Sequence, residues 1–146
     1  MDELYSRLGV LLADTYALYL KTQNYHWHVR GPLFKSMHEL FEEQYRELAE
    51  AVDDVAERLR TLGQRAPATF KALEQLKTIP DGDSTLLANE MVLELANDHN
   101  RLVQDLNAAI VLAQNVNDEG TISLLSDRIV AHEKSRWMLS ISSEGS

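Results

Sequence analysis

The sequence predicts an all-α protein in which four long helices form a bundle, with a short extra helix in the crossover between the second and third. Apolar residues recur every three or four positions over four long segments, which is the spacing of a helix with one buried face. The three prolines lie between those segments. One connection is far longer than the others, and no stretch shows the alternating pattern of a half-buried strand.

The first helix is expected to begin with Asp2 as its N-cap and to run to about Val29. A Gly31-Pro32 pair then breaks it, because both residues disfavour a continuing helix. A second long helix follows from about Phe34 to Leu62 and stops near Gly63. Its apolar stripe, which we assign to the core of the bundle, is Met37, Phe41, Leu48, Val52, Val55, Leu59 and Leu62.

Residues 64–83 form the long connection, which Pro67, Pro80 and Asp81-Gly82 punctuate. Within it, Phe70 to Lys77 could form a short helix. A connection of this length usually has structure of its own or a topological role. Here it could carry the chain back along the bundle, so that the second and third long helices run parallel.

Asp83 or Ser84 is expected to cap the third long helix. Residues 115–120 form a turn, and the fourth helix is expected from about Thr121 to Ile141. Four long helices with one long crossover are the arrangement of ferritin-like bundles, so we expect a single ferritin-like domain over residues 1–146. The apolar positions of the third helix include Leu86, Leu87, Met91, Leu95, Leu102, Leu106 and Ile110.

Potential metal ligands gather on the second helix. His38/Glu42 and Asp53/Glu57 are both (i, i+4) pairs, so each pair projects from one helix face. The four residues fall within a sector of roughly 100° around the helix. His26, near the end of the first helix, adds a second imidazole. Imidazoles with several carboxylates suit iron, manganese or zinc.

The two ligand pairs cannot bind one ion within a single chain, because Glu42 and Asp53 are roughly 16 Å apart along the helix. A second copy of the helix, antiparallel about a two-fold near Glu47-Leu48, would place the histidine-bearing end opposite the acidic end of its partner. This operation makes two identical sites per dimer. Ala49 and Ala56 lie in the same sector and allow close approach. We therefore predict a metal site shared between subunits.

A simpler interpretation competes for the acidic pair, since exposed helix faces are commonly rich in solvated carboxylates. Asp53 and Glu57 alone would be weak evidence for a metal site, and the match with the histidine pair strengthens it. Asp54 falls outside the ligand sector, so Asp53 is preferred.

Other conspicuous residues have ordinary explanations. His28 and His99 are interpreted as lone structural or surface groups, and His132 as a packing or ion-pairing residue. Tyr25 and Tyr45 are interpreted as packing residues rather than redox partners.

The composition narrows the function. The chain has 146 residues, 45% of them hydrophobic, which is enough for one domain with a core. Its net charge of −9 disfavours a general nucleic-acid-binding surface and favours attraction of cations. The absence of cysteine excludes thiolate metal sites and disulfides. No segment has the features of a signal peptide or a membrane span, so a cytoplasmic protein is expected.

Several motifs together resemble those of the Dps proteins, or mini-ferritins, over nearly the whole chain. A conventional ferritin or bacterioferritin is less similar, because those proteins use Glu-x-x-His motifs inside one bundle and this sequence has none. The motifs are Asn24-Tyr25-His26-Trp27, Gly31-Pro32, His38-Glu39-Leu40-Phe41-Glu42, Asp53 to Arg58 with Leu62-Gly63, Ser126-Asp127-Arg128, His132-Glu133-Lys134 and Trp137-Met138-Leu139.

The resemblance implies a hollow homododecamer that oxidises Fe(II), with hydrogen peroxide as preferred oxidant, and stores ferric mineral against oxidative stress. It implies a ferroxidase site at the dimer two-fold. The matching ligands are His26, His38 and Glu42 from one subunit and Asp53 and Glu57 from the other. Many members carry aspartate where this chain has Glu42, and the longer carboxylate should still coordinate, with altered geometry. Iron is the expected metal, with zinc or manganese as substitutes.

Two further roles come from the resemblance. Trp27 matches an aromatic residue beside the site that could intercept a stray oxidising equivalent, although a space-filling role at an interface is equally open. Family members admit iron through acidic three-fold pores, for which Asp118, Glu119 and Asp127 are candidates.

Two other functions remain as alternatives: a nucleoid-associated shell that protects DNA with little catalysis, and a plain helical interaction module. Dps proteins that bind DNA usually use a basic terminal extension. Here Arg7 is the only basic residue before Lys21, and the last seven residues contain no lysine or arginine. Because electrostatic binding scales with the number of phosphates neutralised, we expect DNA binding to be weak or absent.

Overall fold

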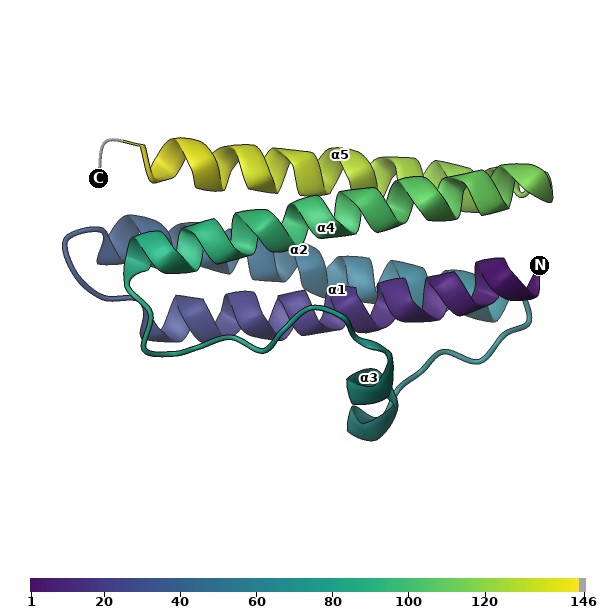
Figure 1. Ribbon diagram of the computed structural model, residues 1–146, viewed down its shortest axis with the longest axis horizontal. Helices are drawn as coiled ribbons and strands as arrows, with labels where there is room; N and C mark the ends of the chain where they lie inside the picture. Colours follow the sequence, from purple (N-terminus) through teal and green to yellow (C-terminus); the bar gives the residue numbers. More distant parts are fainter. Residues whose placement is uncertain (145–146) are drawn as a thin grey trace.

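Four long helices lie side by side, and a short fifth helix projects from the connection between two of them (Figure 1). The computed structural model describes residues 1–144. The elements in this range are α1 (Asp2–His28), α2 (Phe34–Thr61), α3 (Phe70–Leu76), α4 (Ala88–Asn115) and α5 (Glu119–Ser142), with no strand among them. The predicted fold class, a four-helix bundle with a short helix in the crossover, is confirmed.

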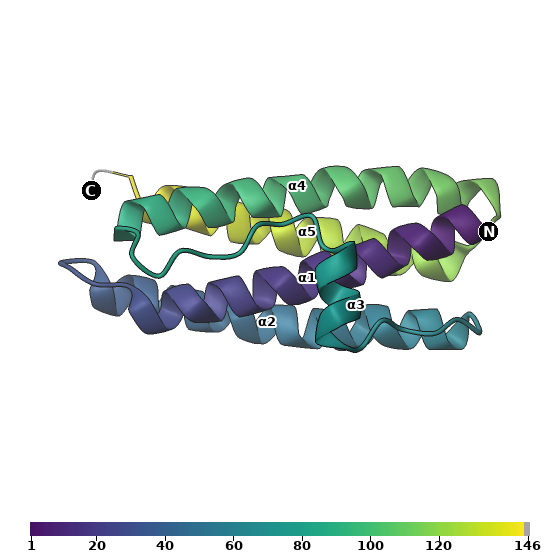
Figure 2. The same ribbon diagram turned by 60° about the horizontal axis from the view of Figure 1, so that its bottom comes forward.

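The crossover carries the chain back along the outside of the bundle. In Figure 1, α2 runs away from the end where α1 finishes, and the connection returns to that end before α4 begins. The second and third long helices, α2 and α4, are therefore parallel, as predicted. Figure 2 shows the crossover and α3 on the outer side of α1, against which α3 packs.

The end of α2 is a Schellman motif around Gly63. The N–H of Gln64 donates to the carbonyl of Leu59 at 2.9 Å, and the N–H of Gly63 donates to the carbonyl of Arg60 at 3.0 Å. Gly63 has φ +79°, a left-handed conformation that costs glycine little. The predicted stop near Gly63 is confirmed for this reason.

Two helix starts differ slightly from prediction. Met1 is the N-cap of α1, and Asp2 lies in its first turn, where its negative charge complements the helix dipole. Helix α5 begins at Glu119 rather than Thr121, because the Asp118 side chain accepts a hydrogen bond from the Thr121 N–H at 3.1 Å.

Helix α4 begins later in the sequence than predicted. Neither Asp83 nor Ser84 is its cap, since the N-cap is Leu87. The Asp83 carboxylate instead accepts hydrogen bonds from the backbone N–H and the hydroxyl of Thr85, at 2.9 and 2.6 Å, which forms a local turn. Arg30 donates to the carbonyl of Thr85 at 3.3 Å, so this carbonyl is engaged outside the helix.

Two side chains of α1 attach the crossover to the bundle. The fully buried Asp14 accepts hydrogen bonds from the N–H and hydroxyl of Thr78, both at 2.6 Å, and from the Ile79 N–H at 2.9 Å. The hydroxyl of Tyr25 accepts from the Asp83 N–H at 3.1 Å. The path of the crossover is thus fixed at its middle and at its end.

The core lies between the four long helices, with α1, α2 and α4 supplying most of it. None of the helices described for residues 1–144 has the length and apolar character needed to cross a bilayer. The largest fully buried side chains are Tyr25, Phe41, Leu4, Leu8, Leu11, Leu12, Leu18, Leu48, Leu59, Ile79, Met91 and Leu95.

Candidate metal centre

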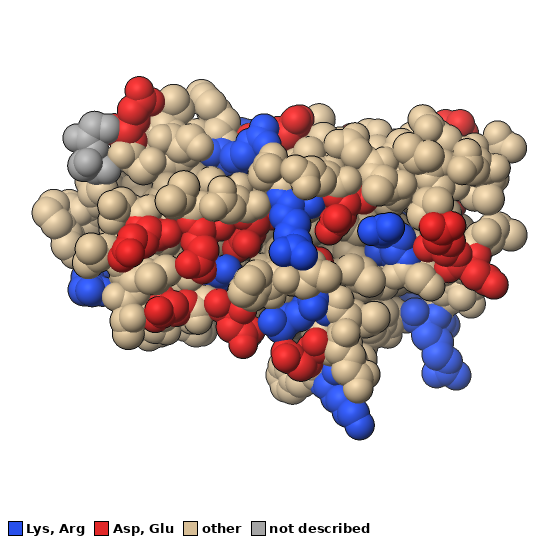
Figure 3. Space-filling model, in the orientation of Figure 1, with Lys and Arg blue, Asp and Glu red and all other residues tan. Residues whose placement is uncertain are grey.

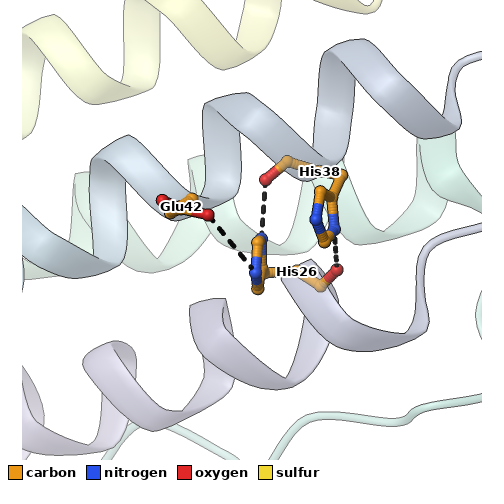
Figure 4. Close-up of side chains that lie close together, drawn as sticks. All are labelled: His26, His38 and Glu42. Carbon is orange, nitrogen blue, oxygen red and sulfur yellow. Dashed lines mark hydrogen bonds and ion pairs between the residues drawn. The ribbon is translucent and has the colours of Figure 1, made fainter.

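Three of the five predicted ligands come together where α1 ends and α2 begins (Figure 4). His26 lies in the last turn of α1, and His38 and Glu42 lie on neighbouring turns of α2. One potential ligand atom from each residue lies within 4.8 Å of the other two. The two imidazole rings stack with their centroids 3.8 Å apart, and His26 Nε2 is 3.7 Å from a Glu42 carboxylate oxygen.

Each imidazole is oriented by the backbone of the other residue. His26 Nδ1 is 2.7 Å from the carbonyl oxygen of His38, and His38 Nδ1 is 2.6 Å from the carbonyl oxygen of His26. A carbonyl oxygen only accepts, so each Nδ1 carries a proton and donates it. In the neutral rings both Nε2 atoms therefore keep a free lone pair. This tautomer can bind a metal ion through Nε2. The hydrogen bond that each Nδ1 donates to a carbonyl oxygen keeps the ring in this form.

The surroundings of the cluster are apolar on one side and open on the other. The Tyr45 ring meets the His26 ring edge-on at a centroid distance of 5.2 Å, and His26 is only 6% exposed. The Glu42 side chain is 41% exposed, and its second oxygen accepts a hydrogen bond from Arg46 Nε at 3.1 Å. A cation could therefore approach from the carboxylate side.

The acidic end of α2 forms a second cluster. Asp53, Asp54 and Glu57 are all exposed, and one carboxylate oxygen from each lies within 4.8 Å of the others. Both aspartates are near Glu57, so the preference for Asp53 stays a prediction. Sharing of an ion between this cluster and the histidine cluster of a second chain also stays a prediction.

Trp27 and the three pore candidates lie outside both clusters of potential ligands. Trp27 is 59% exposed, and within residues 1–144 its ring contacts no other aromatic ring. Asp118 forms an ion pair with Arg58 at 2.7 Å, which ties the end of α2 to the start of α5. Glu119 and Asp127 are exposed. The proposed roles of all four residues stay predictions.

Two histidines that are far apart in the sequence form a pair inside the bundle. His99 and His132 are 0% and 1% exposed, and their Nδ1 atoms lie 2.9 Å apart. Arg128 lies 3.1 Å from His132 Nε2 and forms a two-pronged ion pair with Glu47. The interpretation of His99 as a lone group is wrong. These histidines are 33 residues apart on different helices, so no local spacing could have linked them.

The hydrogen bonds determine where this second pair carries its protons. Arg128 can only donate, so His132 Nε2 accepts and its proton lies on Nδ1, which donates to His99 Nδ1. The proton of His99 then lies on Nε2, which has no hydrogen-bond partner among the described residues. Burial, followed by the charges of Arg128 and Arg136, lowers the pKa of His99 to about 3. Burial also lowers the pKa of His132. The pair is neutral and has no lone pair to offer a metal.

Comparison with known proteins identifies the family to which this chain belongs. A family model for the ferritin-like domain matches residues 6–142. Over 132 residues the chain is 36% identical to DNA protection during starvation protein 2 of Bacillus anthracis, and the match covers 90% of each sequence. The chain belongs to the Dps family. The resemblance predicted from its motifs is confirmed.

Solved Dps structures have the same fold. The crystal structure of a Dps protein from Bacillus brevis matches with a TM-score of 0.93 at 34% identity, covering 96% of this chain and 94% of that one. A Dps protein from Vibrio cholerae O1, described as a member of a broad superfamily of ferritin-like diiron-carboxylate proteins, matches with a TM-score of 0.92 at 31% identity, covering 96% and 88%. The ferritin-like bundle is therefore confirmed for this Dps-family chain.

Proposed function

We propose that this chain is a ferroxidase and iron-storage subunit of the cytoplasm. In this proposal twelve copies, built from two-fold dimers, form a hollow shell that oxidises Fe(II) with hydrogen peroxide and stores the ferric product. The observation that carries the proposal is the convergence of two free Nε2 lone pairs and one carboxylate where α1 meets α2. Membership of the Dps family supports it.

In the proposed site Fe(II) is the substrate, and each ligand has a distinct part. The neutral imidazoles of His26 and His38 hold Fe(II), while Glu42 adds a hard oxygen ligand that favours Fe(III). Asp53 and Glu57 from the second subunit complete the set across the two-fold. Two irons supply the two electrons that peroxide needs, so 2 Fe(II) + H2O2 + 2 H+ gives 2 Fe(III) + 2 H2O. Zinc or manganese would fit the same donors as substitutes.

The test is peroxide-driven Fe(II) oxidation, followed by absorbance, in wild type beside two ligand variants. We expect His38→Ala and Asp53→Ala each to abolish rapid oxidation. When the two variants are dissociated and reassembled together, mixed dimers contain one site with His38 from one chain and Asp53 from the other. That site is intact, so activity should return in part.

Asp54→Ala is the matched control, since it removes a neighbouring carboxylate of the same exposed cluster. Its oxidation rate should stay within a few-fold of wild type. If reassembly of the two inactive variants restores nothing although dodecamers form, the shared site is wrong. If Asp54→Ala is as damaging as Asp53→Ala, the assignment of the acidic ligand is wrong.

A DNA-protecting shell associated with the nucleoid is the second candidate, and the name of the Bacillus anthracis relative supports it. The charge distribution opposes it. Figure 3 shows one face on which acidic and basic side chains are interspersed, without a continuous basic strip, and the net charge is −9. We expect no salt-sensitive gel shift of duplex DNA by metal-free protein. A clear shift would favour the second candidate.

A further inference from the structure

Arg46 completes a ring of contacts on the carboxylate side of the proposed metal centre. Its Nε donates to one oxygen of Glu42 at 3.1 Å, and its guanidinium carbon lies 5.4 Å from the centre of the Tyr45 ring. The Tyr45 ring meets His26 at a centroid distance of 5.2 Å, and His26 Nε2 is 3.7 Å from the other oxygen of Glu42. Because a guanidinium stays protonated at any physiological pH, a permanent positive charge lies next to a proposed iron ligand.

The two oxygens of Glu42 have different neighbours. Figure 4 shows one of them turned toward the ring of His26, and the other accepts the hydrogen bond from Arg46. An ion on the histidine side can therefore bind one oxygen of Glu42 while the other oxygen stays with the guanidinium. Arg46 and the ion then share a single carboxylate.

The ion pair between Arg46 and Glu42 adds little to the stability of the fold. The two side chains are 67% and 41% exposed, and water screens an ion pair of this kind. Arg46 follows His38 by eight positions, roughly 80° around the helix, so it lies in the sector that carries the proposed ligands. In the proposed dimer the second chain covers this sector, and a covered charge acts more strongly on its surroundings. The effect of Arg46 is therefore expected at the metal centre.

We propose that Arg46 promotes release of the ferric product from the centre to the mineral store. This inference rests on the proposed function. Coulomb repulsion between the guanidinium and a bound ion is proportional to the charge of the ion, so Fe(III) is repelled more strongly than Fe(II). The carboxylates act in the opposite direction, because hard oxygen ligands favour Fe(III). Arg46 offsets that preference, so the centre empties after oxidation and can bind Fe(II) again.

The first experiment measures binding without oxidation. Zn2+ suits the same donors and does not change oxidation state, so titration calorimetry of the assembled protein with Zn2+ reports the charge beside the centre. Arg46→Gln removes the charge and keeps a polar side chain, and we expect it to bind Zn2+ roughly fivefold more tightly than wild type. Arg46→Lys keeps the charge, so its affinity should stay within about twofold of wild type.

The second experiment measures how fast the centre empties. A first addition of Fe(II) with peroxide fills every centre with ferric product, and an equal second addition follows after increasing delays. The amplitude of the rapid oxidation phase in the second addition reports the fraction of centres that are free. This recovery should be several-fold slower in Arg46→Gln than in wild type, and close to wild type in Arg46→Lys.

Two controls separate a local effect of Arg46 from a change in net charge. Arg101→Gln removes the same charge from an exposed position in the middle of α4, and it should change neither the affinity for Zn2+ nor the recovery. In a Glu42→Ala background, Arg46→Gln should change the affinity for Zn2+ less than it does in wild type. The reason is that the guanidinium has then lost the carboxylate that holds it beside the centre.

The results for Arg46→Gln and for wild type distinguish this inference from the proposed function. If wild type oxidises Fe(II) with peroxide but Arg46→Gln fails either to bind Zn2+ more tightly or to empty more slowly, the inference is wrong and the ferroxidase proposal stands. The inference is also wrong if Arg46→Lys behaves like Arg46→Gln, because the charge is then not the cause. If wild type oxidises no Fe(II) faster than buffer, both fail.

Discussion

Two pairs of histidines in this chain have similar contacts and opposite chemistry. His26 and His38 stack at the junction of α1 and α2 with their centroids 3.8 Å apart, and His99 and His132 meet inside the bundle at 5.2 Å. In the first pair, backbone carbonyls take both Nδ1 protons and leave both Nε2 lone pairs open. In the second pair, Arg128 and the bond between the rings use the available lone pairs.

The comparison indicates that the lone pair a histidine can offer to a metal depends on the partner of its other nitrogen and on the sign of the nearest charge. Beside the first pair stands the carboxylate of Glu42, which attracts a cation. Beside the second stands the guanidinium of Arg128, which repels a cation. Burial first, and then the charges of His99 and Arg128, lower the pKa of His132. Residue type alone distinguishes neither case.

Metal binding should show the largest difference between the two pairs when one histidine is removed from each. His38→Ala deletes a free lone pair, so we expect the affinity for Fe(II) to fall by on the order of 100-fold or more. His99→Gln should leave the affinity within a few-fold of wild type. Anaerobic titration calorimetry on assembled protein measures both. Equal losses in the two variants would show that the buried pair takes part in binding.

The stability of the fold should depend more on the His99 and His132 pair than on the His26 and His38 pair. His132→Ala leaves a cavity and strips partners from Arg128 Nη2 and His99 Nδ1, both in the buried interior. We expect the free energy of unfolding to fall by about 2–5 kcal/mol. Denaturant unfolding at equal chain concentration measures the change, because assembly also contributes to stability.

An exposed histidine, His28, and the half-buried His38 serve as the references for that measurement. His28→Ala removes an exposed ring whose hydrogen bonds, among residues 1–144, are to Asn24, and it should change the free energy of unfolding by less than about 0.5 kcal/mol. His38→Ala should cost less than His132→Ala. A larger loss for His38→Ala would contradict the assignment of the buried pair as the structural one.

Acid should act on stability through the buried pair. In the unfolded chain His99 titrates near its ordinary pKa of 6.5, whereas in the fold burial and nearby arginines lower its pKa to about 3. The unfolded state therefore binds more protons below pH 6.5. The resulting stabilisation is complete above that pH and is lost as the pH falls toward 3. The expected slope is roughly 1 kcal/mol per pH unit for each histidine.

A double variant isolates this contribution, since other groups also titrate in acid. His99→Gln with His132→Gln should unfold with a shallower dependence on pH between 6.5 and 4 than wild type. Urea unfolding across that range tests the expectation. Parallel curves for the two proteins would mean that the pair is already protonated in the fold.

The parts of the molecule that sequence reasoning predicted are those set by local patterns. The apolar stripe of α2 and the stop at Gly63 follow from helical spacing and glycine conformation, and His38 and Glu42 follow from a four-residue interval. The start of α4 could not be predicted, because it depends on contacts of Asp83 and Arg30 with distant segments.

Contacts between side chains on different helices could not be predicted from the sequence either. The contact of His99 with His132 joins two helices, as does that of Tyr45 with Tyr19, and no spacing along one helix encodes either. The ring of Tyr45 packs against Tyr19 and His26, which agrees with its interpretation as a packing residue, but the identity of these neighbours follows from the bundle alone. Contacts between helices become visible once the bundle fixes which faces meet.

The smallest expected effect concerns the carboxylate of Glu42, which lies beside the His26 and His38 pair. Glu42→Asp keeps the carboxylate but withdraws it by one methylene and loses the contact with Arg46, which is itself largely exposed. We expect the rate of Fe(II) oxidation to change by less than about tenfold, or about 1.4 kcal/mol of activation free energy. Glu42→Gln keeps the length and removes the charge, and should slow oxidation more. Stopped-flow measurement of both variants decides the order. If Glu42→Asp oxidises Fe(II) more slowly than Glu42→Gln, the length of the side chain matters more than its charge. The opposite charges of Glu42 and Arg128 would then not explain the difference between the two histidine pairs.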